Sequence, residues 1–278
     1  MTDDPYRPTT PTAVLPPDAT ADVAPPPADA PAQPTDAAPQ PADAPAQVPG
    51  VPAQFADVIA TGDAPNSRLV SLDVPIEIVD AGDGRKAEMI GDIDRLKDLS
   101  SQQGDNPYGV RGDCGLVSCR NIFEQFGLQS TEQSVVAYAI AHGLCDMGKP
   151  GDPPESLGGS SPLGQARILT DNGVPSHVWG GRSAEDIAGF VQQGRGVLIG
   201  VNAGVLWNDP DAVGNGEPNH AITVIGVVRD PSTQTLEGFV VNDSGDGKTK
   251  VVSADDMEKC FVQKGGVCVA TDNPAPRR

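Results

Sequence analysis

The spacing of apolar residues divides the chain into a helical part followed by a part made of strands. Between residues 113 and 194, apolar positions recur three and four residues apart in segments that open at Ser or Asp and mostly close at Gly, as in amphipathic helices. From residue 196 onward the apolar runs are short, β-branched and separated by turn residues, which is typical of strands. The pattern predicts an α+β domain in which helices precede a mainly antiparallel sheet.

The expected helices cover residues 113–127, 130–144, 161–173 and 183–194. Asp113 stands where the first helix needs an N-cap, and Gly127 stands where it needs a stop. Ser130 and Gln133 have the spacing of a capping box at the start of the second helix. Ser161, with proline after it, opens the third helix.

The expected strands after the helices cover residues 196–207, 220–230, 236–245 and 265–272. The loop 229–235 joins the second and third of them as a hairpin. Before the helices, one or two short strands are expected within residues 68–86, and a short polar helix within residues 91–109.

Residues 1–65 have a different composition from the rest. Fifteen of the 28 prolines precede residue 55, and the string PADAPAQ occurs twice, at residues 27–33 and 41–47. Such a segment has too little apolar surface to offset its ordering entropy. We expect a disordered Pro/Ala-rich acidic tail over residues 1–65 and one domain over residues 66–278.

Charge and hydropathy exclude several classes of partner. The formal net charge is −19 and Lys and Arg form no cluster, which argues against binding to nucleic acid or to an anionic membrane. No apolar run approaches the length of about 20 residues that spans a bilayer, and the first residues lack the pattern of a signal peptide. The protein is therefore expected in the cytoplasm or as the cargo of a specialised secretion system.

The five cysteines show no short repeated spacing and no CxxC pair, so we expect no zinc site and no disulfide framework. A single bridge between Cys260 and Cys268 is left open. Cys114 follows an expected N-cap, where free amides and the helix dipole favour a thiolate. Cys119 falls on the apolar face of the same helix. We interpret Cys114 as a nucleophile and Cys119 as packing.

A thiol nucleophile needs a base, and the chain has three histidines. His142 lies near the end of an expected helix and His177 in a short strand that enters a glycine turn, and both are interpreted as structural. His220 opens an otherwise apolar strand after a polar loop, where packing does not require it. We therefore pair His220 with Cys114.

The hairpin supplies a third group. If residues 220–230 and 236–245 pair as expected, the start of the first strand lies opposite the end of the second, which places Asn242 and Asp243 beside His220. Strand alternation allows only one of the two to face His220, and the hairpin alone does not decide which.

The segments GDCGLVSCRNIF, NHAITVIGV and VNDSGDG resemble motifs of the papain-like cysteine peptidases, within roughly Gln102 to Ala270. The nearest branch includes the leader-cleaving peptidase domains of bacterial peptide exporters and related secreted effector and toxin modules. The resemblance implies an α+β fold with the nucleophile at a helix N-terminus packed on a mainly antiparallel sheet. It further implies that Cys114 attacks a carbonyl, His220 relays the proton and Asp243 orients His220, with no cofactor and no metal.

One position departs from the family pattern. The family usually carries a Gln about six residues before the nucleophile as an oxyanion donor, and Tyr108 stands there. Gln103, eleven residues ahead of Cys114, can serve only if GDNPYGV is an inserted loop. The backbone amide of Cys114 would be the second donor.

The resemblance implies hydrolysis of a peptide or isopeptide bond in a protein or peptide substrate, through a thioester intermediate. Three other functions stay open: deamidation, transamidation or acyl transfer with the same triad; cell-wall amide hydrolysis; and binding without catalysis on the same fold. If the protein is a toxin, a cognate immunity protein is expected as a partner.

Overall fold

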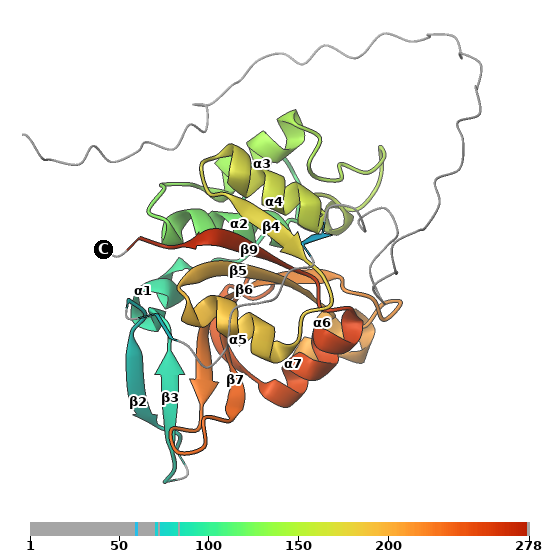
Figure 1. The fold of residues 1–278 in the computed structure, drawn as a ribbon. Helices are drawn as coiled ribbons and strands as arrows, with labels where there is room; N and C mark the ends of the chain where they lie inside the picture. Colours follow the sequence, from blue (N-terminus) through green and yellow to red (C-terminus); the bar gives the residue numbers. More distant parts are fainter. Residues whose placement is uncertain (1–58, 61–69, 72, 83, 277–278) are drawn as a thin grey trace, which may run out of the picture.

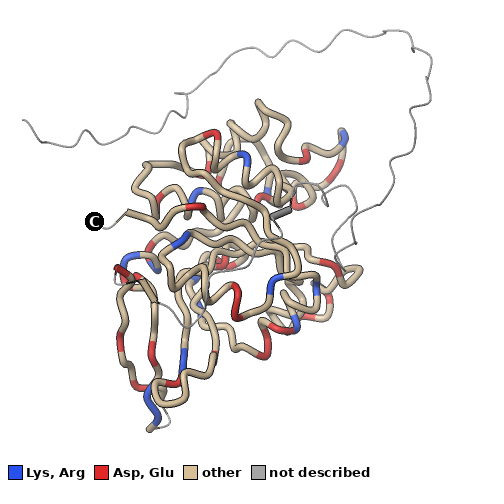
Figure 2. Tube along the Cα trace, viewed as in Figure 1, with Lys and Arg blue, Asp and Glu red and all other residues tan. Residues whose placement is uncertain are grey.

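The computed structural model describes residues 59–60, 70–71, 73–82 and 84–276. The expected disordered tail therefore lies outside the described residues, apart from the short strand β1 (Ile59–Ala60). Figure 1 shows helices on both sides of a central sheet, with a two-stranded hairpin that projects from one end. Lys and Arg are scattered among Asp and Glu along the trace (Figure 2).

Nine strands of the described chain form one sheet in the order β1-β4-β9-β5-β6-β3-β2, and β7 and β8 extend it from the other side of β6. The strands after β1 are β2 (Ile76–Asp80), β3 (Lys86–Ile90), β4 (Ser176–Trp179), β5 (Arg195–Val201), β6 (His220–Arg229), β7 (Leu236–Asp243), β8 (Lys248–Ser253) and β9 (Cys268–Pro274). Every pairing except β1–β4 is antiparallel. The predicted α+β class with a mainly antiparallel sheet is confirmed.

The α-helices of the described chain are α1 (Ile93–Leu96), α2 (Cys114–Gln125), α3 (Glu132–Ala141), α4 (Pro162–Asp171), α5 (Ala184–Gln192), α6 (Ala203–Trp207) and α7 (Ala254–Cys260). Short 3-10 turns cover Lys97–Leu99, Pro154–Ser156, Pro210–Ala212 and Val262–Lys264. One apolar core lies between the α2, α3 and α4 group and the sheet, around Leu116 and Phe123. A second core lies on the opposite face under α5 and α7, around Phe190 and Phe261.

Two expected boundaries are wrong. The second helix is capped by Thr131 and not by Ser130, because the Thr131 side chain accepts from the Ser134 amide and Ser134 reciprocates. The strand expected over residues 196–207 ends at Val201. Asn202 caps the following helix, α6, since its side chain accepts from the Val205 amide, and local capping outweighs the strand propensity of the apolar run.

The chain after β7 contains elements that the apolar pattern did not reveal. Strand β8 and helix α7 are both polar on one side, which conceals their apolar positions. Cys260 and Cys268 are free thiols, so the bridge left open between them is not formed.

The close approach of β7 and β8 gives a first testable prediction. A Cβ at Gly238 would lie 2.5 Å from the Val252 carbonyl oxygen of β8. We expect Gly238→Ala to lower the free energy of unfolding by about 1–3 kcal/mol, because the two strands must separate. Chemical denaturation measures this loss. Gly200→Ala is the control, since the nearest atom to its Cβ would be 3.7 Å away; equal losses in both variants would contradict the prediction.

Candidate active site

Cys114 is the first residue of α2 and is half-buried. The first amides of a helix have no acceptor inside the helix, so this position presents free N–H groups around the thiol. Helix α2 packs across β5 and β6, and the Ser118 hydroxyl donates to the Ala221 carbonyl at 3.4 Å. This packing holds the start of α2 against the start of β6.

His220 is the first residue of β6 and is 7% exposed. Its Nε2 atom lies 2.7 Å from Asp243 Oδ1, and the neighbouring Cys114 thiol, which lines the same cleft, raises the pKa of its ring. Because Nε2 serves Asp243, the other ring nitrogen is the one left for Cys114. The three residues singled out by sequence are thus brought together by α2, β6 and β7.

The β6–β7 hairpin decides between the two candidates for the third group. Asp243 pairs with Ile222 in the register of the hairpin, and its carboxylate reaches His220. Asn242 faces the opposite side, where its amide donates to the Leu96 carbonyl at 2.9 Å and accepts from the Thr249 hydroxyl at 2.7 Å.

The Asp243 side chain is fully buried, and four donors surround its carboxylate. Oδ1 accepts from His220 and from the Gly245 amide at 2.8 Å. Oδ2 accepts from Trp207 Nε1 at 2.7 Å and from Lys250 Nζ at 2.9 Å. Burial alone would raise the pKa of Asp243, but these bonds, led by that to His220, hold it far below its usual value.

The same contacts favour a charged imidazole. Burial lowers the pKa of His220, whereas its hydrogen bond to Asp243 and the neighbouring Cys114 thiol raise it, to a net value of about 9. At neutral pH the ring is therefore the imidazolium. The charged ring lines the same cleft as the Cys114 thiol.

Trp207 and Lys250 were missed by sequence reasoning. Trp207 is the last residue of α6, and its ring lies over His220 with a centroid distance of 5.0 Å. The expected strand over residues 196–207 concealed this role, because only the helix turns the indole toward Asp243. Lys250 gives no sequence signal, since β8 was not expected.

A cleft of about 370 Å³ adjoins Cys114 and His220. Its lining also includes Gly159, Ser160, Ser161, Gly200 and Val267. A neighbouring hollow shares Asp146, Gly159 and Ser161 with it, so the cleft continues along the α3–α4 loop. An extended chain fits such an open groove better than a small enclosed molecule does.

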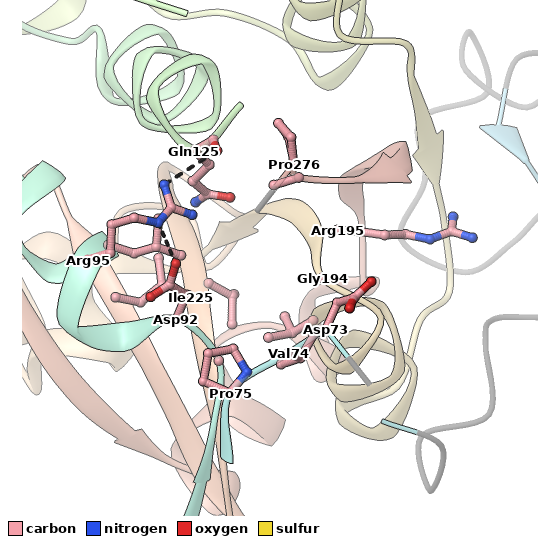
Figure 3. Close-up of a pocket in the computed structure, with 15 residues that line it drawn as sticks. Asp73, Val74, Pro75, Asp92, Arg95, Gln125, Gly194, Arg195, Ile225 and Pro276 are labelled. Atoms are coloured by element: carbon pink, nitrogen blue, oxygen red, sulfur yellow. Dashed lines mark hydrogen bonds and ion pairs between the residues drawn. The ribbon is translucent and has the colours of Figure 1, made fainter. Parts of the chain in front are cut away.

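A separate cavity of about 350 Å³ lies at the other end of α2 (Figure 3). Arg95 reaches the Gln125 carbonyl there at 3.5 Å and forms an ion pair with Asp92. Cys114, His220 and Asp243 do not line this cavity. It is therefore separate from the candidate active site.

The Gln103 side chain lies beside the turn that follows Asp243. Its Nε2 atom donates to the Arg111 carbonyl at 2.6 Å, and its Oε1 atom accepts from the Ser244 hydroxyl at 3.0 Å. Gln103 is not among the residues that line the cleft. Its role as an oxyanion donor stays a prediction that requires the amide to turn toward Cys114.

The two other histidines are exposed and lie outside the triad. His142 contacts the Tyr138 carbonyl at 2.8 Å and His177 contacts Asp272 at 2.6 Å. Within the described part of the chain, no group of three or more His, Cys, Asp or Glu side chains could hold a metal ion. No helix found there has the length and apolarity to cross a bilayer.

Five chains among the solved structures are similar to this one. The chain is similar to the crystal structure of a "putative C39-like peptidase" from Bacillus anthracis, at 17% sequence identity and a TM-score of 0.46, over 65% of this chain and 98% of that one. No protein-family model and no curated protein matches the sequence.

A second buried carboxyl group, Asp113, lies directly before the nucleophile. Its side chain does not cap α2. It lies instead beside Glu132, and Asn106 Nδ2 donates to both carboxyl groups, at 3.3 and 2.9 Å. Burial and the charge of Glu132 raise the pKa of Asp113 to about 7. The protonated acid is therefore the form that the fold favours.

This pair predicts a pH-dependent stability. The unfolded chain ionises Asp113 near pH 4 and the folded one near pH 7, so stability is lost as pH rises through that window. We expect Asp113→Asn to raise the melting temperature at pH 8 by about 2–6 °C, with a smaller gain at pH 5, where only part of that window has been crossed. Thermal unfolding at both pH values measures this, with exposed Asp105→Asn as the control. A loss of stability in Asp113→Asn at both pH values would refute it.

Cys119 gives a separate prediction. It is fully buried among the residues of the α2 core, and burial raises the pKa of its thiol far above the usual value. We expect Cys119→Ala to cost about 1–2 kcal/mol of stability while the reactivity of Cys114 stays unchanged. Denaturation and alkylation of the same sample measure both. A loss of Cys114 reactivity at unchanged stability would show that Cys119 has a chemical role.

Proposed function

We propose that the protein is a thiol-dependent hydrolase that cleaves a peptide or isopeptide bond, in the manner of papain-like cysteine peptidases. The observation that carries the proposal is the buried Asp243–His220 pair in the same cleft as Cys114 at the start of α2. A reactive cysteine requires this combination of helix N-terminus, imidazole and orienting carboxylate. The open cleft beside it favours a polypeptide as the substrate.

The proposed reaction has two stages. The Cys114 thiolate attacks the scissile carbonyl carbon. Backbone amides at the start of α2 donate hydrogen bonds to the carbonyl oxygen and stabilise the negative charge that develops on it. The His220 imidazolium gives its proton to the leaving amine as the C–N bond breaks, which leaves a thioester on Cys114. Neutral His220 then takes a proton from water, the hydroxide attacks the thioester, and the acid product leaves with the thiolate restored.

Asp243 acts throughout by holding the imidazole. Its bond to Nε2 fixes which ring nitrogen faces Cys114 and stabilises the imidazolium, which is present before the first stage and forms again when water is deprotonated in the second. Trp207 donates to the other carboxylate oxygen, and its exposed ring lies against the imidazole. Exclusion of water there strengthens the interaction between carboxylate and imidazolium.

Thiol reactivity tests the proposal without a known substrate. We expect iodoacetamide to label Cys114 rapidly well below pH 8, because the thiolate forms beside the imidazolium. In His220→Ala the rate should fall by about tenfold or more at pH 6.5 and follow an ordinary thiol profile. Mass spectrometry locates the adduct, and the half-buried Cys145 provides an internal reference thiol.

Cleavage of a general protein substrate is the second readout. Cys114→Ala should abolish it with the fold retained, His220→Ala should nearly match, and Asp243→Ala should lose less, since it only orients the base. Cleavage by Cys114→Ala would refute the mechanism. Slow alkylation of Cys114 with an ordinary thiol profile in the parent protein would refute the assembled pair.

A further inference from the structure

The Asp243 carboxylate is shared between two cations. On one side it meets the His220 imidazolium at 2.7 Å, and on the other it meets Lys250 Nζ at 2.9 Å. The Lys250 side chain is 29% exposed and also reaches Asp246 at 3.0 Å. The carboxylate is fully buried, so the interaction with Lys250 is screened less than a surface ion pair would be.

Strand β8 places Lys250 at this point. Its cross-strand partner in β7 is Val241, which puts Lys250 diagonal to Asp243 on the same face of the sheet. The turn at residues 244–247 brings Asp246 back to the same amine. Burial lowers the pKa of Lys250, but its bonds to Asp243 and Asp246 raise it above the usual value, and the amine stays charged.

A second cation on the carboxylate works against the imidazolium. Lys250 neutralises part of the negative charge that stabilises protonated His220, and its own charge repels the ring across the carboxylate. The other ionisable groups around His220 are Cys114 from α2, Asp243 from β7 and Asp246 from the following turn. Helix α6 contributes only the neutral indole of Trp207. None of these groups carries a positive charge, so Lys250 is the cation in this set that opposes the imidazolium.

We propose that Lys250 is a positioning residue that limits the basicity of His220 through Asp243, and so lets the imidazole release its proton to the leaving amine. The catalytic consequence rests on the proposed function, whereas the effect on His220 does not. If the pKa of His220 were too high, the imidazolium would not give its proton to the leaving amine. Lys250 thereby sets the upper end of the pH range in which the site works.

An NMR titration of the His220 ring tests the inference directly. The chain has three histidines, so His142→Gln and His177→Gln assign the ring signals. A Cys114→Ala background removes the coupled titration of the thiol. In this background we expect Lys250→Met to raise the pKa of His220 by about 0.5–1 pH unit. Lys250→Arg should restore the parent value, because it keeps the charge.

Lys248→Met is the matched control. It removes the same charge from the same strand, and although Lys248 lies opposite Asp243 in β7, it forms no ion pair with that carboxylate among the described side chains. The His220 pKa should therefore stay within about 0.2 unit of the parent value. A merely structural Lys250 predicts the opposite sign. Loss of packing would loosen Asp243 and let the pKa of His220 fall. A fall or no change in Lys250→Met, or an equal rise in Lys248→Met, overturns the inference.

The pH profile of Cys114 alkylation or of cleavage supplies the link to function. With the thiol intact, Lys250→Met should move the alkaline limb upward by the same shift. A shifted His220 pKa in a protein whose Cys114 is unreactive would uphold the role of Lys250 and reject the proposed hydrolase. A reactive Cys114 together with a His220 pKa that does not change in Lys250→Met would support the proposed hydrolase and reject the role of Lys250.

Discussion

A fully buried carboxylate keeps its charge only where donors replace the water that it has lost, and the Asp243 side chain is such a group. Its four donors come from β6, from α6, from the turn after β7 and from β8. Each of these elements must therefore stand in one register relative to the others. The orientation of His220, and with it the state of Cys114, depends on that single arrangement.

The sheet provides the arrangement through close backbone approaches. The β6–β7 pairing sets Asp243 opposite Ile222, so the carboxylate meets the ring two residues earlier on the same face. Gly238 permits β8 to lie close against β7 at Ser253, and three pairs further along the same ladder Lys250 lies opposite Val241. Helix α2 then crosses β5 and β6 and delivers Cys114 to the other side of the imidazole.

The site contains two buried carboxyl groups with opposite environments. Asp243 is surrounded by donors and is held ionised, whereas Asp113 lies against Glu132 and is held toward the protonated form. The fold therefore holds one carboxylate ionised by surrounding it with donors, and raises the pKa of the other by burial beside a second carboxyl group.

The sequence alone determined the class of fold and the helix that begins at Cys114, and it predicted that this thiol, His220 and the end of the next strand lie together. These follow from local physics: apolar spacing, capping residues and the short loop of a hairpin define elements whose ends must meet. The tertiary structure decided what local patterns do not encode. It chose Asp243 over Asn242 by the face of the strand, turned the apolar run after Val201 into the helix that carries Trp207, and brought Lys250 to the carboxylate from a strand with no apolar alternation. Side-chain contacts across a sheet depend on register, and register is fixed only when all the strands pack together.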